Sequence, residues 1–219
     1  PRSFRSGQSR SSFEAAGAKV PNEAQLQVRC HCGSCAFRAT VRGEAGTPLC
    51  AIRCYCQACR KYHTSSFSAF TSIDRDQIPE ATEKIPICRY SDDCKSSGPV
   101  ERLFCGKCFS VLGTLPSEGP AFLALGCVED SSVPASLARY WQETFEEREV
   151  TSMASWWTAV PRAERAERRR TLRGGCACGR CQFEAVSGDE FQTQHCYCNL
   201  CRRLSGSVAQ TWVPVRNRG

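Results

Sequence analysis

The sequence predicts a mostly β, zinc-stapled protein that is duplicated, with a short helical linker between the copies. Three observations support this prediction. The 219 residues include 18 cysteines in regularly spaced groups, and these groups recur in the same order in the second half of the chain. Short runs of β-prone residues alternate with Gly, Pro and Ser. The length suits one to two domains, and an apolar fraction of 41% allows a buried core.

The composition also excludes some classes of protein. No stretch approaches the roughly 20 apolar residues of a membrane helix, so we expect no membrane partner. No charged-then-apolar signal segment opens the chain. Because the sequence begins with Pro1 rather than Met, we expect a fragment or a processed form.

The N-terminal segment reads as a disordered tail over residues 1–25. It is rich in Ser and Arg and poor in acidic residues, which is also typical of the remnant of a transit sequence. The first zinc-binding domain is then expected over residues 26–158.

The cysteine motifs reveal an internal repeat. The sequence Cys-His-Cys-Gly-Ser-Cys-Ala-Phe from Cys30 matches Cys-Ala-Cys-Gly-Arg-Cys-Gln-Phe from Cys176, at an offset of 146. The sequence Cys-Tyr-Cys-Gln-Ala-Cys-Arg from Cys54 matches Cys-Tyr-Cys-Asn-Leu-Cys-Arg from Cys196, at an offset of 142. The order and the spacing together predict a tandem duplication.

The first copy has a third motif, Cys105-Gly106-Lys107-Cys108, whose equivalent would lie beyond residue 219. We therefore predict a second, incomplete copy over residues 174–219. In that copy, Cys176 and Cys178 are expected to form an incomplete structural site.

Zinc prefers four tetrahedral ligands and binds thiolates well. A C-x-C pair on a strand places both sulfurs on one face, and a C-x-x-C turn does the same. One four-thiolate set is therefore predicted, and a closed set of this kind is structural. Its members are Cys30, Cys32, Cys105 and Cys108.

A second group offers three ligands, which leave one position for water or substrate, as at catalytic zinc sites. It consists of Cys54, Cys56 and Cys59, and the second copy repeats it with Cys196, Cys198 and Cys201. The alternative is a fourth ligand from elsewhere in the chain, and the candidates are Cys35, Cys50, Cys88, Cys94, Cys127, His31 and His63.

The competing interpretation of the cysteines is a set of disulfides. Cysteines at i and i+2 rarely bridge each other without strain, so metal binding is favoured. The side chains of Cys35 and Cys181 are expected to be buried and to pack among apolar side chains. Cys50, Cys88, Cys94 and Cys127 have no repeat partner and are expected to be core or surface thiols.

Between the motifs, Ala36–Val41 and Phe67–Phe70 read as short strands. Residues 159–173 read as a basic linker that is helical from Pro161 to Arg173, because Pro suits the first helical position and Ala, Glu and Arg are good helix formers. Six Arg against two Glu make this linker basic, but no aromatics interleave them. We therefore expect a solvated linker and no nucleic-acid partner.

These motifs resemble the family of glutathione-dependent formaldehyde-activating enzymes and their relative centromere protein V. The resemblance rests on Cys30-His31-Cys32-Gly33, on Cys54 to Cys59, and on Phe104-Cys105-Gly106-Lys107-Cys108. Residues 126–130 look like the family's later strand and turn, and Trp156-Trp157 looks like its closing aromatic. The chain departs from the family pattern at Phe109 and at Thr64-Ser65, where the family often has Gly.

The resemblance implies small curled antiparallel sheets stapled by two zinc ions per complete domain. It also implies that glutathione is a co-substrate and that formaldehyde and glutathione are joined into S-hydroxymethylglutathione, with carbon–sulfur lyase activity in the reverse direction. The implied partner is a small thiol–aldehyde adduct.

Two functions follow as hypotheses. The first is a zinc-dependent carbon–sulfur lyase-like enzyme that acts on a glutathione–aldehyde adduct. The second is a non-catalytic zinc-binding interaction module that resembles centromere protein V. No side chain stands out as a general base, and His63 is only the nearest candidate. Thiolate sites predict a reducing compartment, the cytoplasm or the nucleus.

Overall fold

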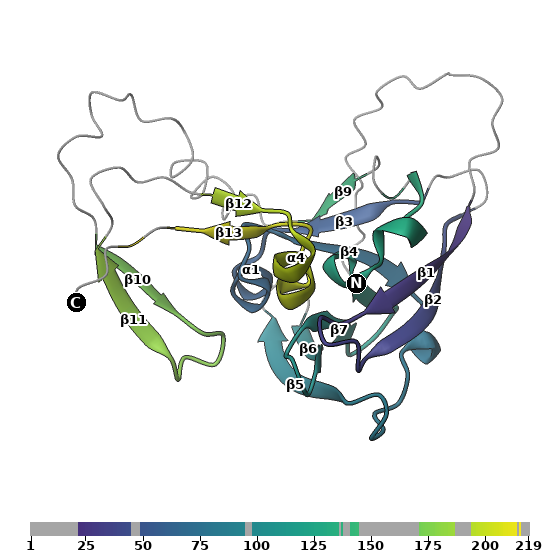
Figure 1. Ribbon diagram of the computed structural model, residues 1–219, viewed down its shortest axis with the longest axis horizontal. Helices are drawn as coiled ribbons and strands as arrows, with labels where there is room; N and C mark the ends of the chain where they lie inside the picture. The colour runs from purple at the N-terminus through teal and green to yellow at the C-terminus, as the bar shows by residue number, and fades with distance from the viewer. Residues whose placement is uncertain are drawn as a thin grey trace, which may run out of the picture.

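The computed structural model describes residues 22–44, 49–94, 98–135, 137, 141–144, 171–186, 194–213 and 215. Side chains are described in these ranges except at 93, 94 and 141–144. The described part is mostly β, as predicted, with antiparallel hairpins, one larger sheet and two short α-helices (Figure 1). None of its helices has the length and hydropathy that a membrane span needs.

The first hairpin pairs β1 (Glu23–Arg29) with β2 (Ala36–Arg42). Residues alternate along both strands, so that Leu26 and Val28 of β1 are buried while their neighbours face outward. β1 begins inside the predicted N-terminal tail, and β2 confirms the strand predicted over Ala36–Val41.

The large sheet has seven strands in the order β5-β6-β7-β8-β4-β3-β9. All neighbouring strands are antiparallel except β3 and β9, which run parallel. Two of its pairings, β4 with β8 and β3 with β9, join strands distant in sequence, which local sequence patterns do not predict. Its strands are β3 (Ala51–Cys54), β4 (Ser68–Ile73), β5 (Ile87–Cys94), β6 (Gly98–Cys105), β7 (Val111–Pro116), β8 (Ala121–Ala124) and β9 (Trp141–Thr144).

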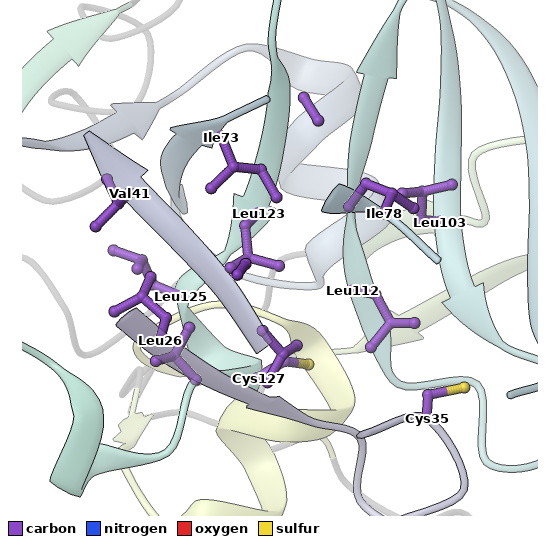
Figure 2. Close-up of a cluster of buried hydrophobic side chains, with 14 of the residues drawn as sticks. Leu26, Cys35, Val41, Ile73, Ile78, Leu103, Leu112, Leu123, Leu125 and Cys127 are labelled. Atoms are coloured by element: carbon purple, nitrogen blue, oxygen red, sulfur yellow. The ribbon is translucent and has the colours of Figure 1, made fainter. Parts of the chain in front are cut away.

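The core lies between the first hairpin and the large sheet (Figure 2). Leu26, Leu112 and Leu123 belong to this buried cluster, and so do Cys30 and Cys105. Two of the predicted metal ligands are therefore part of the hydrophobic core.

Short helical turns connect the strands. Among these are α1 (Gln57–His63), η1 (Arg75–Gln77), η2 (Leu125–Cys127) and η3 (Asp130–Ser132). The segment 126–130, expected as a strand and turn, is instead formed by these last two 3-10 turns, with a single bridge between Val128 and Val28.

The C-terminal part has the same sequence of local elements as the N-terminal part. The hairpin of β10 (Thr171–Gly175) and β11 (Gln182–Val186) corresponds to β1 and β2, and the series β12 (Gln194–Cys196), α4 (Asn199–Ser205) and β13 (Gln210–Trp212) corresponds to β3, α1 and β4. Helix α4 starts and ends 142 residues after α1. The two parts thus share their order of local elements, while the duplication itself stays a prediction.

The predicted linker helix needs a correction at its end. Thr171–Arg173 pair with Glu184–Val186 as part of β10, because β11 supplies a hydrogen-bonding strand that outweighs their helical propensity. The rest of the linker, the closing Trp156-Trp157 and the tail up to residue 21 lie outside the described residues.

Helix α4 packs on the N-terminal part beside α1, whereas the β10–β11 hairpin extends away from the large sheet (Figure 1). Gly126 donates a backbone hydrogen bond to the carbonyl of Gly206. Arg202 pairs with Asp130 at 2.7 Å, and Arg203 pairs with Glu129 at 2.8 Å. The C-terminal part is thus anchored on η2, η3 and the residues between them.

Candidate metal centres

The four predicted structural ligands come together. Cys30 and Cys32 follow β1, and Cys105 and Cys108 end β6 and the turn after it; the four sulfurs all lie within 4.8 Å of one another. Strands from different parts of the chain therefore converge on one point at the edge of the core.

The distances in this set suit a tetrahedral ion. Four sulfurs held about 2.3 Å from a zinc ion lie about 3.8 Å apart. The Sγ atoms of Cys30 and Cys32 are 3.6 Å apart, and those of Cys32 and Cys105 are 3.8 Å apart. These separations are far longer than the roughly 2.05 Å of a disulfide bond, and none of the described cysteines forms a disulfide. The geometry fits a metal and not a disulfide.

Hydrogen bonds shape the first of the two turns. Gly33 has a φ of +79°, a conformation that glycine tolerates best, and its amide bonds the Cys30 carbonyl. The amide of Cys35 donates to the Cys30 sulfur at 3.2 Å. Hydrogen bonds from Ser34 lower the pKa of Cys32 to about 6, whereas burial raises the pKa of Cys30 to about 12. Metal binding must therefore release a proton from Cys30 at neutral pH.

The second turn carries one of the departures from the family pattern. Phe109, where the family often has Gly, has a φ of +59° and an exposed side chain. Its amide bonds the Cys105 carbonyl, and its ring stacks on Phe104. A left-handed residue at this point explains why glycine suits it.

The three predicted ligands of the second site also converge. Cys54 ends β3, Cys56 caps α1 and Cys59 lies in the first turn of the helix, with the three sulfurs within 4.8 Å of one another. The Cys59 amide donates to the Cys56 sulfur at 3.4 Å. The C-x-C-x-x-C spacing thus uses a strand end and a helix start to aim three sulfurs at one point.

No fourth Cys, His, Asp or Glu among the described side chains joins this set. Of the alternative ligands, the side chain of Cys94 lies outside the described part. His63 is fully buried and packs edge-on against the rings of Tyr62 and Phe70. Burial lowers its pKa to about 3, helped by the nearby Arg102 guanidinium, so it is a neutral core residue and not an accessible base.

A buried arginine contacts the three-Cys site. Arg102 on β6 is 1% exposed, and its Nη1 donates to the Cys59 sulfur at 3.4 Å. Its Nη2 pairs with Asp92 at 3.2 Å, and Nη1 also donates to Thr114 Oγ1. The sequence did not single out Arg102. Its only signal is a charge on the same strand face as the buried Val100, two positions earlier.

The second copy repeats the three-Cys geometry in a more open setting. Cys196, Cys198 and Cys201 lie within 4.8 Å of one another, and Cys198 caps α4 as Cys56 caps α1. The sulfurs of the half-buried Cys176 and the exposed Cys178 are 3.3 Å apart, but no third ligand joins them among the described residues.

The other cysteines divide by environment. Cys35 is fully buried, as predicted. Cys181 is exposed, contrary to the prediction, because its turn joins a hairpin whose described contacts are mainly its own two strands. Cys127 is buried, and its thiol donates to the carbonyl of Val111; Cys50 is half-buried and Cys88 exposed.

The comparisons with known proteins agree with the motifs. No curated protein sequence matches the chain. The model of the family described as glutathione-dependent formaldehyde-activating enzyme matches residues 25–144 and 171–218. The two matched ranges contain all three clusters, and together they span well over half of the chain. The chain therefore belongs to the family of glutathione-dependent formaldehyde-activating enzymes.

Proposed function

We propose that this protein is a zinc-dependent enzyme of the carbon–sulfur lyase type that acts on the adduct of glutathione and formaldehyde. The observation that carries the proposal is the three-Cys site of Cys54, Cys56 and Cys59, which no fourth protein ligand completes among the described side chains. A site with three protein ligands has room for a substrate atom. Family membership supplies the substrate class.

The proposed reaction joins the sulfur of glutathione to the carbonyl carbon of formaldehyde, and the thiol proton ends on the former carbonyl oxygen. A zinc ion held by Cys54, Cys56 and Cys59 would hold the sulfur as a thiolate at neutral pH. The chain contributes the positions of these ligands: β3 fixes Cys54, and the helix start fixes Cys56 and Cys59. The four-Cys set would hold the second zinc and staple β1 to β6.

The test combines metal content with turnover. Zinc-loaded protein should accelerate exchange between formaldehyde, glutathione and S-hydroxymethylglutathione, measured by NMR, and the metal-free protein should not. Cys56→Ser should abolish the activity, although serine can still cap α1. Cys88→Ser is the matched control, since Cys88 is exposed and outside every cluster. Equal, slow exchange with and without zinc would disprove the enzymatic proposal.

One observation favours the second candidate, a non-catalytic zinc module. Cys56 and Cys59 are each only 6% exposed, which limits the approach of a substrate from their side. Stoichiometric zinc with no exchange activity would support this candidate. Both candidates require thiolates, and for either we propose a reducing compartment, the cytoplasm or the nucleus.

A further inference from the structure

Arg102 is the largest of the fully buried side chains in the described part of the chain. Its guanidinium reaches the Cys59 sulfur, the Asp92 carboxylate and the Thr114 hydroxyl, and it lies 5.3 Å from the centre of the Tyr62 ring. A buried charge is costly unless it is paired. Asp92 is the partner by formal charge and accepts from Nε and Nη2, whereas Nη1 faces the metal-binding motif through Cys59.

The negative charge expected at the three-Cys site explains why a cation in contact with Cys59 is favourable. Three thiolates around a divalent ion leave one net negative charge, and a fourth thiolate would leave two. In a buried site this repulsion is poorly screened. Arg102 offsets one of these charges at Cys59, while the side chain of Asp92 keeps 19% exposure and so retains some solvation.

We propose that Arg102 determines which ligand the three-Cys site accepts at its fourth position, favouring an anionic sulfur over a neutral ligand. On binding, a thiol gives up its proton to solvent and a water molecule leaves. The inference rests on the proposed function only for the metal and for the thiol class of substrate. Arg102 is a positioning residue here, because it acts through Cys59 and its charge.

The C-terminal cluster offers a comparison within the same chain. Cys196, Cys198 and Cys201 match the ligands of the first site, but the neighbouring arginines are engaged elsewhere. Arg202 bonds Asp130 and Asn199, and Arg203 bonds Glu129. This cluster is also more exposed, so its charge is better screened by water. We expect it to lack the preference for anionic sulfur.

The test uses the full chain loaded with Co²⁺, whose visible bands report each change of ligand. Cys176→Ser, Cys196→Ser and Cys201→Ser are present in every variant, and the four-Cys set has no position for an added ligand, so that only the first three-Cys site responds. Glutathione and imidazole are titrated separately as the anionic and the neutral ligand. Arg102→Met should weaken glutathione binding by about 10- to 100-fold, the usual range when a residue that hydrogen-bonds a metal ligand is lost, and leave imidazole binding unchanged. Arg102→Lys should restore much of the glutathione affinity.

Two controls separate charge from folding. Thr114→Val removes a neutral neighbour of the guanidinium and should preserve the preference for glutathione. Arg102→Met combined with Asp92→Asn removes both charges, so no unpaired charge stays behind, and it should show the same selective loss. If Arg102→Met weakens glutathione and imidazole equally, or weakens neither, the role of Arg102 is disproved.

The outcomes also distinguish this inference from the proposed function. Selective, Arg102-dependent glutathione binding without formaldehyde exchange would leave the inference standing and contradict the enzymatic proposal. Formaldehyde exchange in a protein whose glutathione binding does not depend on Arg102 would support the enzymatic proposal and contradict the inference. Absence of Co²⁺ binding at the first three-Cys site would overturn both.

Discussion

Ser65 and Ser207 lie 142 residues apart and make the same hydrogen bond in opposite directions. Ser65 Oγ donates to the carbonyl of Ala209 at 2.6 Å, and Ser207 Oγ donates to the carbonyl of Phe67 at 2.8 Å. The two acceptors are themselves 142 residues apart. The segments that follow α1 and α4 therefore pack against each other with local two-fold symmetry, as two related units of a dimer do.

This reciprocal contact predicts a shared dependence of the two copies. Ser65→Ala and Ser207→Ala should each lower the free energy of unfolding by about 1–3 kcal/mol, because each leaves a carbonyl without its donor, at a buried contact for Ser65 and a part-buried one for Ser207. Urea unfolding measures the change. Ser66→Ala is the matched control, because the contact of Ser66 with Thr211 uses its backbone amide, which the substitution keeps. An effect of Ser66→Ala as large as the other two would contradict the prediction.

The close approach of Gly126 to α4 makes a second prediction. A Cβ at this position would lie 2.4 Å from the Arg202 carbonyl oxygen and 2.5 Å from that of Ser207, so the helix would have to move. Gly126→Ala should destabilise the protein by about 1–3 kcal/mol, the usual range for overpacking.

Hydrogen exchange should place the effect of Gly126→Ala in α4 and its neighbours. Gly119→Ala is the control, because nothing lies within 4 Å of its added Cβ, although its φ of +83° brings local strain. It should leave the exchange of α4 unchanged. Unaltered α4 protection in Gly126→Ala would show that the packing of the helix on η2 is not needed for its order.

The sequence was sufficient for the local chemistry and insufficient for what surrounds it. Spacing alone grouped Cys54, Cys56 and Cys59, because a strand end followed by a helix start brings such residues together. Arg102 could not be assigned in the same way, since its contact with Cys59 depends on pairing between strands far apart in sequence. Cys181 was misjudged for a related reason, because burial depends on tertiary packing and not on residue type.

The departure at Phe109 predicts that glycine is tolerated better than alanine at this position. In Phe109→Ala the left-handed backbone conformation stays strained, whereas in Phe109→Gly the strain is relieved; both lose the stacking on Phe104. Phe109→Gly should therefore be the more stable of the two by about 1 kcal/mol. Thermal unfolding of the zinc-loaded proteins measures the difference. Equal stability of the two variants would mean that this turn carries no backbone strain.

His63 predicts how stability depends on pH. Burial lowers its pKa to about 3 in the folded protein, against an ordinary value of 6.5. Below about pH 6.5 the unfolded chain therefore binds a proton that the folded chain does not. The free energy of unfolding then decreases by up to about 1.4 kcal/mol for each unit by which the pH is lowered. His63→Phe should remove this contribution, so that the variant loses less stability than the wild type between pH 6.5 and 5.5.

The measurement is urea unfolding at several pH values with both proteins loaded with zinc, so that acid release of the metal affects them alike. His31→Gln, which replaces an exposed histidine, should keep the wild-type slope. Parallel pH profiles for the wild type and His63→Phe would mean that the folded protein can protonate this ring, and that its burial is less complete than the packing against Phe70 indicates.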